Sequence, residues 1–208
     1  MGSKSSATGF ECRIVTGEAI EQAIELRRRV YTEEFGYDLG GAGPRDALDD
    51  RAIHLLASTT EGKPVGSLRL IDATQRPFEI EAFLDLTPYL DPRRHAAEIT
   101  RLCILAPYRR ISRAAFVHLA IFGAVLRLTR ELGVTDLIAS TRTDLMDFYK
   151  YLLFETYPGA VYEHPEIGNA LHTLMRLDLT TIATRYRSRH PTLYGVVQSA
   201  FGGNAGSQ

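Results

Sequence analysis

Residues 96–110 read AAEITRLCILAPYRR, an apolar run typical of a strand that leads into a turn. Its many aliphatic residues suit a strand that is packed on both faces. Glu98, the hydroxyl-bearing Thr100 and Arg101 do not, because an ionised Glu or Arg in such a place costs several kcal/mol unless it is paired. We therefore expect these charges either to neutralise one another in the folded protein or to take part in chemistry.

The segments around this strand alternate between apolar runs of strand length and longer stretches with helical periodicity. Gly and Pro clusters separate them, and a Gly-containing turn between the second and third strands predicts a hairpin. Strands are predicted at 11–17, 52–59, 64–72, 96–105, 134–141 and 170–179, and helices at 18–36, near 78–86, 112–132, 143–154 and 180–201, the last interrupted at Pro191. This order predicts an α/β sandwich whose central mixed sheet is mostly antiparallel and flanked by helices.

Length and composition are those of one globular domain. The chain has 208 residues, of which 45% are hydrophobic and 24% charged. We expect residues 1–10 to be a flexible leader and residues 11–208 a single domain. The sequence offers neither a secretory signal nor an apolar stretch of transmembrane length, and two cysteines are too few for a disulfide framework, so a cytoplasmic protein is expected. A net charge of −1 does not favour nucleic acid as a partner.

Several reaction classes lose support because their motifs are missing from the sequence. It contains no G-x-S-x-G, no G-x-x-x-x-G-K-[ST] and no C-x-x-C or H-x-x-x-H pair. The six histidines are scattered, and we assign no role to any of them. Neither a metal site nor a tightly bound cofactor is expected.

Charged residues also occur at other unexpected positions. Arg27 lies on the first predicted helix, Asp46 and Asp49 lie in a Gly-rich loop, and Arg69 lies inside a hairpin strand. With Glu98 and Arg101 they make three positive and three negative groups. Each residue alone is best explained by solvation or by a buried ion-pair network that holds the loop against the sheet.

Taken together, the spacing of these residues resembles the acyl-homoserine-lactone synthases and the related N-acyl amino acid synthases, within the GCN5-type acyltransferase superfamily. The matching segments are LRRRVYTEEFGY with Arg27, Tyr31 and Tyr37, RDALDD with Asp46 and Asp49, GSLRL with Arg69, and EITRL with Glu98, Thr100 and Arg101. Lactone synthases usually carry Phe and Trp near positions 31 and 37, whereas this chain has Tyr at both. The resemblance therefore points to a long-chain N-acyl tyrosine synthase type.

The resemblance implies a role for each matching residue. Glu98 would act as the base or orient the ammonium, and backbone N–H groups near Leu102 and Cys103 would stabilise the oxyanion. The Cys103 thiol itself need not react. Substrate binding is expected from Arg27, Tyr31, Tyr37, Thr100 and Thr141, and a structural network from Asp46, Asp49, Arg69 and Arg101.

The acyl donor is inferred from the segment after the strand. This segment, APYRRISRAA, lacks the glycines with which GCN5-type enzymes bind a pyrophosphate. Their absence argues against recognition of the donor mainly through the nucleotide of coenzyme A. Residues 93–113 carry six arginines against one acid, Glu98. We therefore expect the phosphopantetheine thioester of an acyl carrier protein as donor and an amino acid as acceptor. The docking surface is predicted from Arg93, Arg94, Arg109, Arg110 and Arg113.

Two alternatives remain open at this point. One is an acyl-homoserine-lactone synthase that uses S-adenosylmethionine. The other is a non-catalytic module that binds an acyl chain or a carrier protein on the same fold.

Overall fold

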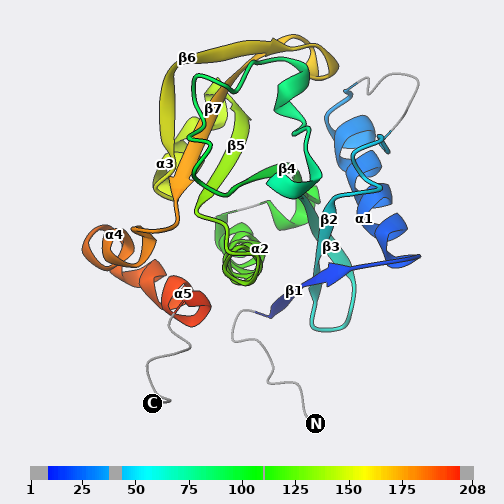
Figure 1. Ribbon diagram of the computed structural model, residues 1–208. Helices are drawn as coiled ribbons and strands as arrows, with labels where there is room; N and C mark the ends of the chain where they lie inside the picture. Colours follow the sequence, from blue (N-terminus) through cyan, green and yellow to red (C-terminus); the bar gives the residue numbers. More distant parts are fainter. Residues whose placement is uncertain (1–8, 38–43, 110, 202–208) are drawn as a thin grey trace. The chain divides into compact units, whose positions relative to one another are not determined.

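The computed structural model describes residues 9–37, 44–109 and 111–201, with the side chains of 111–115 left out (Figure 1). Most of the predicted leader lies outside these residues, although Phe10 already belongs to the first strand. The chain forms two compact units that interleave along the sequence. Unit 1 comprises Met1–Leu70 and Arg101–Ala124, and unit 2 comprises Ile71–Thr100 and Val125–Gln208.

A mixed seven-stranded sheet confirms the predicted α/β class. The strand order is β1-β2-β3-β4-β5-β7-β6. Strand β4, Ala96–Ile104, supplies its first five residues to unit 2 and its last four to unit 1. The apolar run with three polar residues near its middle is therefore the strand that both units share.

Unit 1 is built on the predicted hairpin. Strands β2, Ile53–Thr59, and β3, Pro64–Asp72, pair antiparallel, and β1, Phe10–Val15, pairs antiparallel with β2. On β3, a Cβ at Gly66 would lie 3.1 Å from the Cys103 carbonyl oxygen. Glycine therefore permits the backbone of β3 to approach the end of β4 closely.

Helix α1, Ala19–Arg28, lies beside β2 in unit 1 (Figure 1). The sequence predicts a single helix over 18–36, but the α-helix ends at Arg28 and continues as a π-helix, η1, Arg29–Glu34. Gly36, with φ +68°, follows it in a conformation that favours glycine. The apolar side of this segment packs into a buried cluster of unit 1, formed by Val15, Ala23, Leu26, Val30, Leu56, Cys103 and Leu105.

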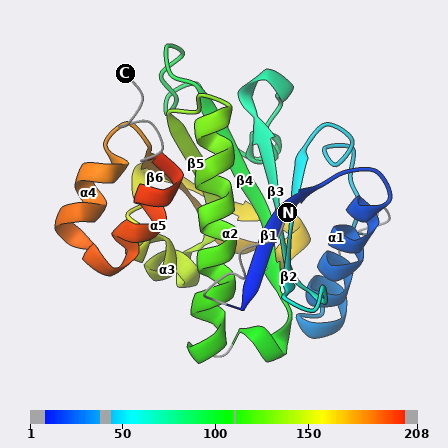
Figure 2. The same ribbon diagram turned by 90° about the horizontal axis from the view of Figure 1, so that it is seen from below.

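Unit 2 contains the remaining strands and the terminal helices. Strand β5, Asp136–Arg142, pairs parallel with β4 and antiparallel with β7, Ala170–Asp178. A short helix α3, Met146–Tyr151, follows β5. Helices α4, Ile182–Arg189, and α5, Pro191–Phe201, lie side by side (Figure 2), and the predicted interruption coincides with Pro191, the first residue of α5.

One strand is not predicted by the sequence pattern. Strand β6, Glu155–His164, pairs antiparallel with β7 at the edge of the sheet. Its sequence ETYPGAVYEH carries Pro158 and Gly159, which are typical of a turn. The structure accommodates them at an irregularity, since the register shifts between Thr156 and Val161.

The long helix α2, Ile111–Glu131, matches the helix predicted over 112–132. Gly133, with φ +69°, follows it as the expected C-terminal cap. The predicted helix near 78–86 is a single 3₁₀ turn, η3, Ile80–Ala82. Among the helices of the described residues, none is both long and apolar enough to cross a bilayer.

Candidate active site

Strand β4 changes conformation in the middle of its charged segment. Its parallel register with β5 runs from Ala96↔Asp136 to Ile99↔Ala139, and both strands continue beyond it. Arg101 has φ +54°, a left-handed conformation that non-glycine residues rarely adopt within a strand. Such strain is concentrated at functional sites, and here it separates Glu98 and Thr100 from Leu102 and Cys103.

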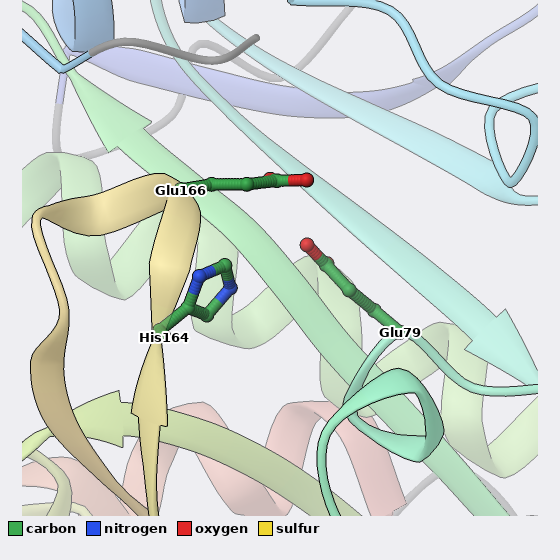
Figure 3. A group of neighbouring side chains, drawn as sticks. All are labelled: Glu79, His164 and Glu166. Atoms are coloured by element: carbon green, nitrogen blue, oxygen red, sulfur yellow. The ribbon is translucent and has the colours of Figure 1, made fainter.

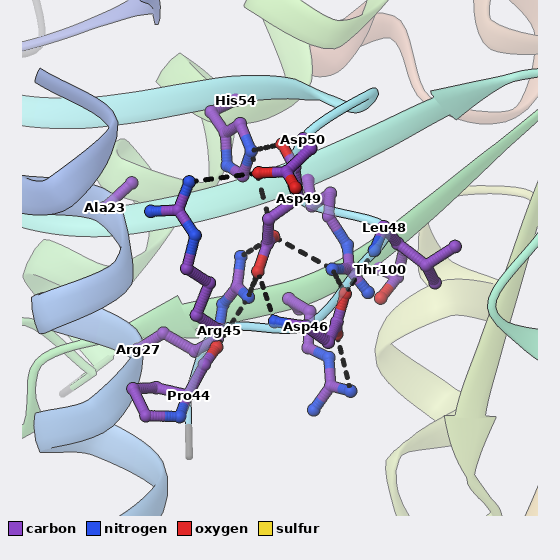
Figure 4. A network of polar contacts seen from close by, with 12 residues as sticks. Ala23, Arg27, Pro44, Arg45, Asp46, Leu48, Asp49, Asp50, His54 and Thr100 are labelled. Carbon is purple, nitrogen blue, oxygen red and sulfur yellow. Dashed lines mark hydrogen bonds and ion pairs between the residues drawn. The ribbon is translucent and has the colours of Figure 1, made fainter. Parts of the chain in front are cut away.

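Unit 1 brings the predicted acidic loop and arginines together in one network (Figure 4). The Arg27 guanidinium donates from Nη1 to both carboxylate oxygens of Asp49, at 3.1 and 3.0 Å, and Arg69 Nη1 donates to Asp49 Oδ1 at 2.9 Å. Arg69 also donates to Asp46 at 2.6 Å, and Arg101 donates to the other oxygen of Asp46 at 3.2 Å. Two carboxylates thus connect three arginines.

Asp49 is the centre of this network. Burial alone would raise the pKa of Asp49, but the charges of Arg27 and Arg69 outweigh burial and lower the pKa below its usual value. The backbone N–H of Asp46 donates to Asp49 Oδ2 at 2.9 Å, which adds to the stabilisation of the charged form. His54 contacts the Asp49 carbonyl oxygen through Nε2 at 3.0 Å, and burial lowers the pKa of His54.

Arg27 lies inside this network, with 1% of its surface exposed. Besides Asp49, its Nη1 donates to the Pro44 carbonyl oxygen at 2.9 Å. The expectation that Arg27 grips a substrate carboxylate stays a prediction. The observed contacts instead give Arg27 the same role as Arg69, since both hold the 44–49 loop through Asp49.

The two predicted tyrosines of η1 and its continuation lie close together in unit 1. The Tyr31 and Tyr37 ring centroids are 6.1 Å apart, and Phe35 stacks on Tyr37 at 5.5 Å. Tyr31 packs against the buried cluster of unit 1, and its hydroxyl donates to the Leu102 carbonyl oxygen at 3.4 Å. Tyr31 thus contacts the segment of β4 after Arg101.

Cys103 is buried beside Ser67. Its Sγ lies 3.1 Å from Ser67 Oγ, and burial raises the pKa of the Cys103 thiol. A thiol held in its neutral form is a poor nucleophile. This environment agrees with the expectation that the Cys103 side chain does not react.

Glu98 lies in unit 2 and is 1% exposed. Its carboxylate accepts the backbone N–H of Glu79 at 2.5 Å and that of Ile80 at 3.2 Å, at the start of η3. Glu98 therefore anchors the η3 turn.

The two predicted threonines occupy β4 and β5. Thr100 donates its hydroxyl to Glu79 Oε2 and is half-buried. Thr141 is buried and faces Thr173 of β7 in the antiparallel register. Thr100 thus joins Glu98 in fixing Glu79, whereas Thr141 lies in the β5–β7 pair.

Sequence reasoning missed a second group of unit 2 residues. Glu79, His164 and Glu166 each offer a ligand atom, and these atoms all lie within 4.8 Å of one another. Figure 3 shows the two carboxylates pointing toward each other beside the imidazole. We call these three residues the tripod. Had strand β6 been predicted, the alternation of side chains along a strand would have placed Tyr162 and His164 on the same face of the sheet.

Aromatic rings surround His164. Phe83 lies 4.5 Å from it and stacks on Tyr162, and His172 lies 5.0 Å away. Burial, followed by the charges of Glu98 and Glu79, raises the pKa of Tyr162. Burial lowers the pKa of His172. The surroundings of His164 are therefore largely aromatic.

Three of the five arginines predicted to dock a carrier protein are paired with acids. Arg94 donates to Asp136 and Asp178, Arg109 pairs with Glu34 and lies over the Phe35 ring, and Arg93 pairs with Asp91 while its side chain is 87% exposed. Arg110 and the side chain of Arg113 lie outside the described residues. The positive surface is thus weaker than the count of arginines suggested.

Comparison with known proteins agrees with the fold. FeeM, an N-acyl amino acid synthase from uncultured soil microbes, is 17% identical with a TM-score of 0.68 and covers 84% of this chain and 93% of its own. The coenzyme A-dependent acyl-homoserine lactone synthase BjaI is 20% identical with a TM-score of 0.62, covering 86% and 89%. The synthase LasI is 16% identical with a TM-score of 0.61, covering 96% and 98%. At these identities the likeness establishes the fold.

The sequence itself establishes the family. A search of curated proteins finds no match. The family model described as N-acyl amino acid synthase FeeM matches residues 22–178, which include most of both units and every predicted site residue. The chain belongs to the FeeM family of N-acyl amino acid synthases and has their acyltransferase fold.

Proposed function

We propose that this protein transfers a long-chain fatty acyl group from the thioester of an acyl carrier protein to the α-amine of an amino acid, with tyrosine as the leading acceptor. Family membership supports N-acyl transfer. The donor, the acceptor and the cytoplasmic setting are the more specific parts of the proposal. It requires no metal and no bound cofactor beyond the donor's own phosphopantetheine arm.

The observation that carries the proposal is the position of Glu98. Its carboxylate is buried on β4, one residue before the β4–β5 register ends, and two backbone N–H groups fix its orientation. A fixed carboxylate with several lone pairs can orient an ammonium and accept a proton, directly or through a water. We assign it this role.

The reaction then needs no covalent intermediate with the enzyme. The ammonium loses one proton toward Glu98, and the neutral amine nitrogen attacks the thioester carbonyl carbon. The C–O double bond opens to an oxyanion, for which we propose the backbone N–H groups of Leu102 and Cys103 as donors. When the oxyanion collapses, the C–S bond breaks, and the thiolate leaves with the second proton of the amine.

On the donor side, Tyr31 and Tyr37 are proposed to line the acyl site. Their rings, with Phe35, form a continuous aromatic group in unit 1. The network of Asp46, Asp49, Arg69 and Arg101 would hold the loop that precedes β2. Because Arg27 is held by Asp49, we propose that it acts within this network.

The test is a product analysis. The protein is incubated with palmitoyl acyl carrier protein and all proteinogenic amino acids, and products are read by mass spectrometry. We expect an N-acyl amino acid with an intact α-carboxylate, and a loss of about 10²–10⁴ in turnover for Glu98→Gln. Near-normal turnover by a folded Glu98→Gln protein would remove Glu98 from the mechanism.

The same assay separates the alternatives. An acyl lactone with release of methylthioadenosine from S-adenosylmethionine would establish a lactone synthase. Binding of the carrier without release of free thiol would indicate a non-catalytic module. Equal catalytic efficiency with palmitoyl-coenzyme A would overturn the preference for a carrier protein.

A further inference from the structure

Arg101 is the residue at which strand β4 changes its backbone conformation. Its φ of +54° is left-handed, and the parallel register with β5 ends at Ile99, shortly before it. We propose that Arg101 is a positioning residue that acts through its backbone. Its left-handed turn sets the place of the following N–H groups, those of Leu102 and Cys103, which are proposed to stabilise the oxyanion. The inference rests on the proposed N-acyltransferase function.

The left-handed backbone is unfavourable for an arginine. In this conformation the Cβ of an L-residue comes too close to the following carbonyl oxygen, which disfavours it about five- to thirtyfold. Glycine has no Cβ and adopts the conformation without this cost, and asparagine adopts it more readily than most other residues. Such strain persists only where the surrounding structure enforces it. The contacts on both sides of Arg101 should therefore hold its backbone.

The side chain of Arg101 makes one of these contacts. Its Nη2 donates to Asp46 Oδ2 at 3.2 Å. Asp46 is itself fixed, since its Oδ1 accepts from Arg69 Nη1 at 2.6 Å and from the backbone N–H of Leu48 at 2.9 Å. A guanidinium that is held in place limits the backbone conformations of its own residue. The acidic loop therefore helps to hold Arg101 in its left-handed conformation.

The segment after the left-handed residue is held against β3, within unit 1. The backbone N–H of Leu105 donates to the Val65 carbonyl oxygen at 3.0 Å, and Cys103 Sγ lies 3.1 Å from Ser67 Oγ. Between them, a Cβ on Gly66 would lie only 3.1 Å from the Cys103 carbonyl oxygen. These contacts leave the segment little freedom to move. The direction that the chain takes before it must therefore match its place on β3.

The end of the β4–β5 register follows from the same turn. Strand β5 continues to Arg142, although its last partner residue in the register is Ala139. The pairing thus ends within β5, and not because β5 itself ends. A left-handed residue inside a strand acts as a β-bulge, which interrupts pairing and re-aims the residues that follow. Arg101 therefore determines where the backbone groups after it lie.

A backbone role and a side-chain role predict different orders among the variants of Arg101. If only the guanidinium mattered, Arg101→Gly and Arg101→Ala would be equally impaired, because both lack it. If the backbone matters, glycine keeps the left-handed turn, whereas alanine has lost the contact with Asp46 and still carries a Cβ. We expect kcat/KM for palmitoyl acyl carrier protein to be about five- to thirtyfold higher for Arg101→Gly than for Arg101→Ala.

Arg176 provides the matched control. It is also a strand arginine that donates to an aspartate, Asp136, at 2.7 Å, and it is not among the described non-glycine residues with positive φ. At such a position glycine is less favourable than alanine because it loses more conformational freedom on folding. In thermal denaturation, Arg176→Gly should melt below Arg176→Ala, whereas Arg101→Gly should melt above Arg101→Ala.

The order at position 101 decides the proposal. If a folded Arg101→Gly protein has a kcat/KM equal to or below that of Arg101→Ala, the guanidinium alone matters and the proposal is wrong. Folding of Arg101→Gly but not of Arg101→Ala supports it. If Arg101→Gly does not fold, Arg101→Asn takes its place in the comparison, with the same expected order. Failure of both Arg101→Gly and Arg101→Asn to fold overturns the proposal.

Failure of the proposed function would look different. If the wild type makes no N-acyl amino acid, amide hydrogen exchange of the full chain tests the backbone conformation without substrate. The Leu105 N–H should exchange about five- to thirtyfold faster in Arg101→Ala than in Arg101→Gly, because loss of the turn weakens its bond to Val65. This result would keep the backbone role and remove only the reaction. Equal exchange in the two variants, or faster exchange in Arg101→Gly, overturns the proposal.

Discussion

The Asp49 network of unit 1 and the group around Glu98 in unit 2 are each centred on a buried carboxylate, but the observed contacts of the two groups differ. Asp49 and Asp46 are contacted by the guanidinium groups of Arg27, Arg69 and Arg101. Glu98 and Glu79 are contacted by backbone N–H groups and a hydroxyl. The observed contacts of the first group thus include full positive charges, and those of the second include backbone and hydroxyl donors.

The contacts of the Asp49 network are those of a structural group. A carboxylate between two guanidinium groups has little to gain from a further cation, and removing it leaves buried charges uncompensated. We therefore expect mutations in the Asp49 network to act chiefly on stability, whereas mutation of Glu98, for which we propose a role in the reaction, should act on turnover.

The largest effect on stability is expected for Asp49→Ala. It would leave Arg27 and Arg69 buried without their shared carboxylate, so the free energy of unfolding should fall by about 3–5 kcal/mol. Urea denaturation followed by circular dichroism measures this. Asp50→Ala, which removes a neighbouring exposed carboxylate, is the matched control and should change little. A loss below about 1 kcal/mol for Asp49→Ala would show that the network does not hold the fold.

A smaller effect is expected for the coupling between Asp49 and Arg69. Arg69 Nη1 lies 2.9 Å from Asp49 Oδ1. Each single alanine variant therefore leaves the other side chain without this partner, whereas the double variant removes both charges. The double variant should be less destabilised than the sum of the singles by about 0.5–3 kcal/mol. Strict additivity in urea denaturation would mean that the two side chains contribute independently.

The pH dependence of stability should distinguish wild type from Asp49→Asn. Because the folded-state pKa of Asp49 is lowered, its contribution is present above the unfolded pKa of about 3.9 and is lost as the pH falls through the folded value. The stability difference between the two proteins should be constant above about pH 5. Below about pH 4 it should shrink by at most about 1.4 kcal/mol per pH unit. A difference that stays constant down to about pH 2 would contradict this.

The sequence carried more information about the Asp49 network than about the tripod. Spacing singled out Arg27, Asp46, Asp49 and Arg69 because a charge in an apolar run, or a D-x-x-D loop after a helix, is conspicuous in a linear sequence. The fold class was equally accessible, since strand and helix periodicities alternate clearly. The sequence pattern could not show which of these charged side chains contact one another. Arg27, for example, was expected to bind a substrate carboxylate, and in the structure its guanidinium contacts Asp49.

The tripod escaped prediction for a physical reason. Its residues lie in a short turn before η3 and at the end of β6, an edge strand whose Pro158 and Gly159 are typical of a loop. Without that strand, His164 was only one of six scattered histidines. Long-range pairing between β6 and β7, including Tyr162↔His172, places these side chains, and such pairing has no local signature.

Arg93 and Arg94 offer the smallest and most specific test, because these neighbours are both paired with acids but differ in exposure. Arg94 is half-buried and donates to Asp136 and Asp178, so Arg94→Glu should lower the denaturation midpoint through repulsion among carboxylates. Arg93 is exposed beside Asp91, so Arg93→Glu should leave the midpoint unchanged.

If the carrier protein docks here, Arg93→Glu should weaken carrier binding a few-fold at low salt and much less at high salt, because exposed rim charges act through screened, long-range attraction. Surface plasmon resonance with acyl carrier protein at two salt concentrations measures this. Carrier affinity that is equal for wild type and Arg93→Glu at low salt would remove Arg93 from the docking surface.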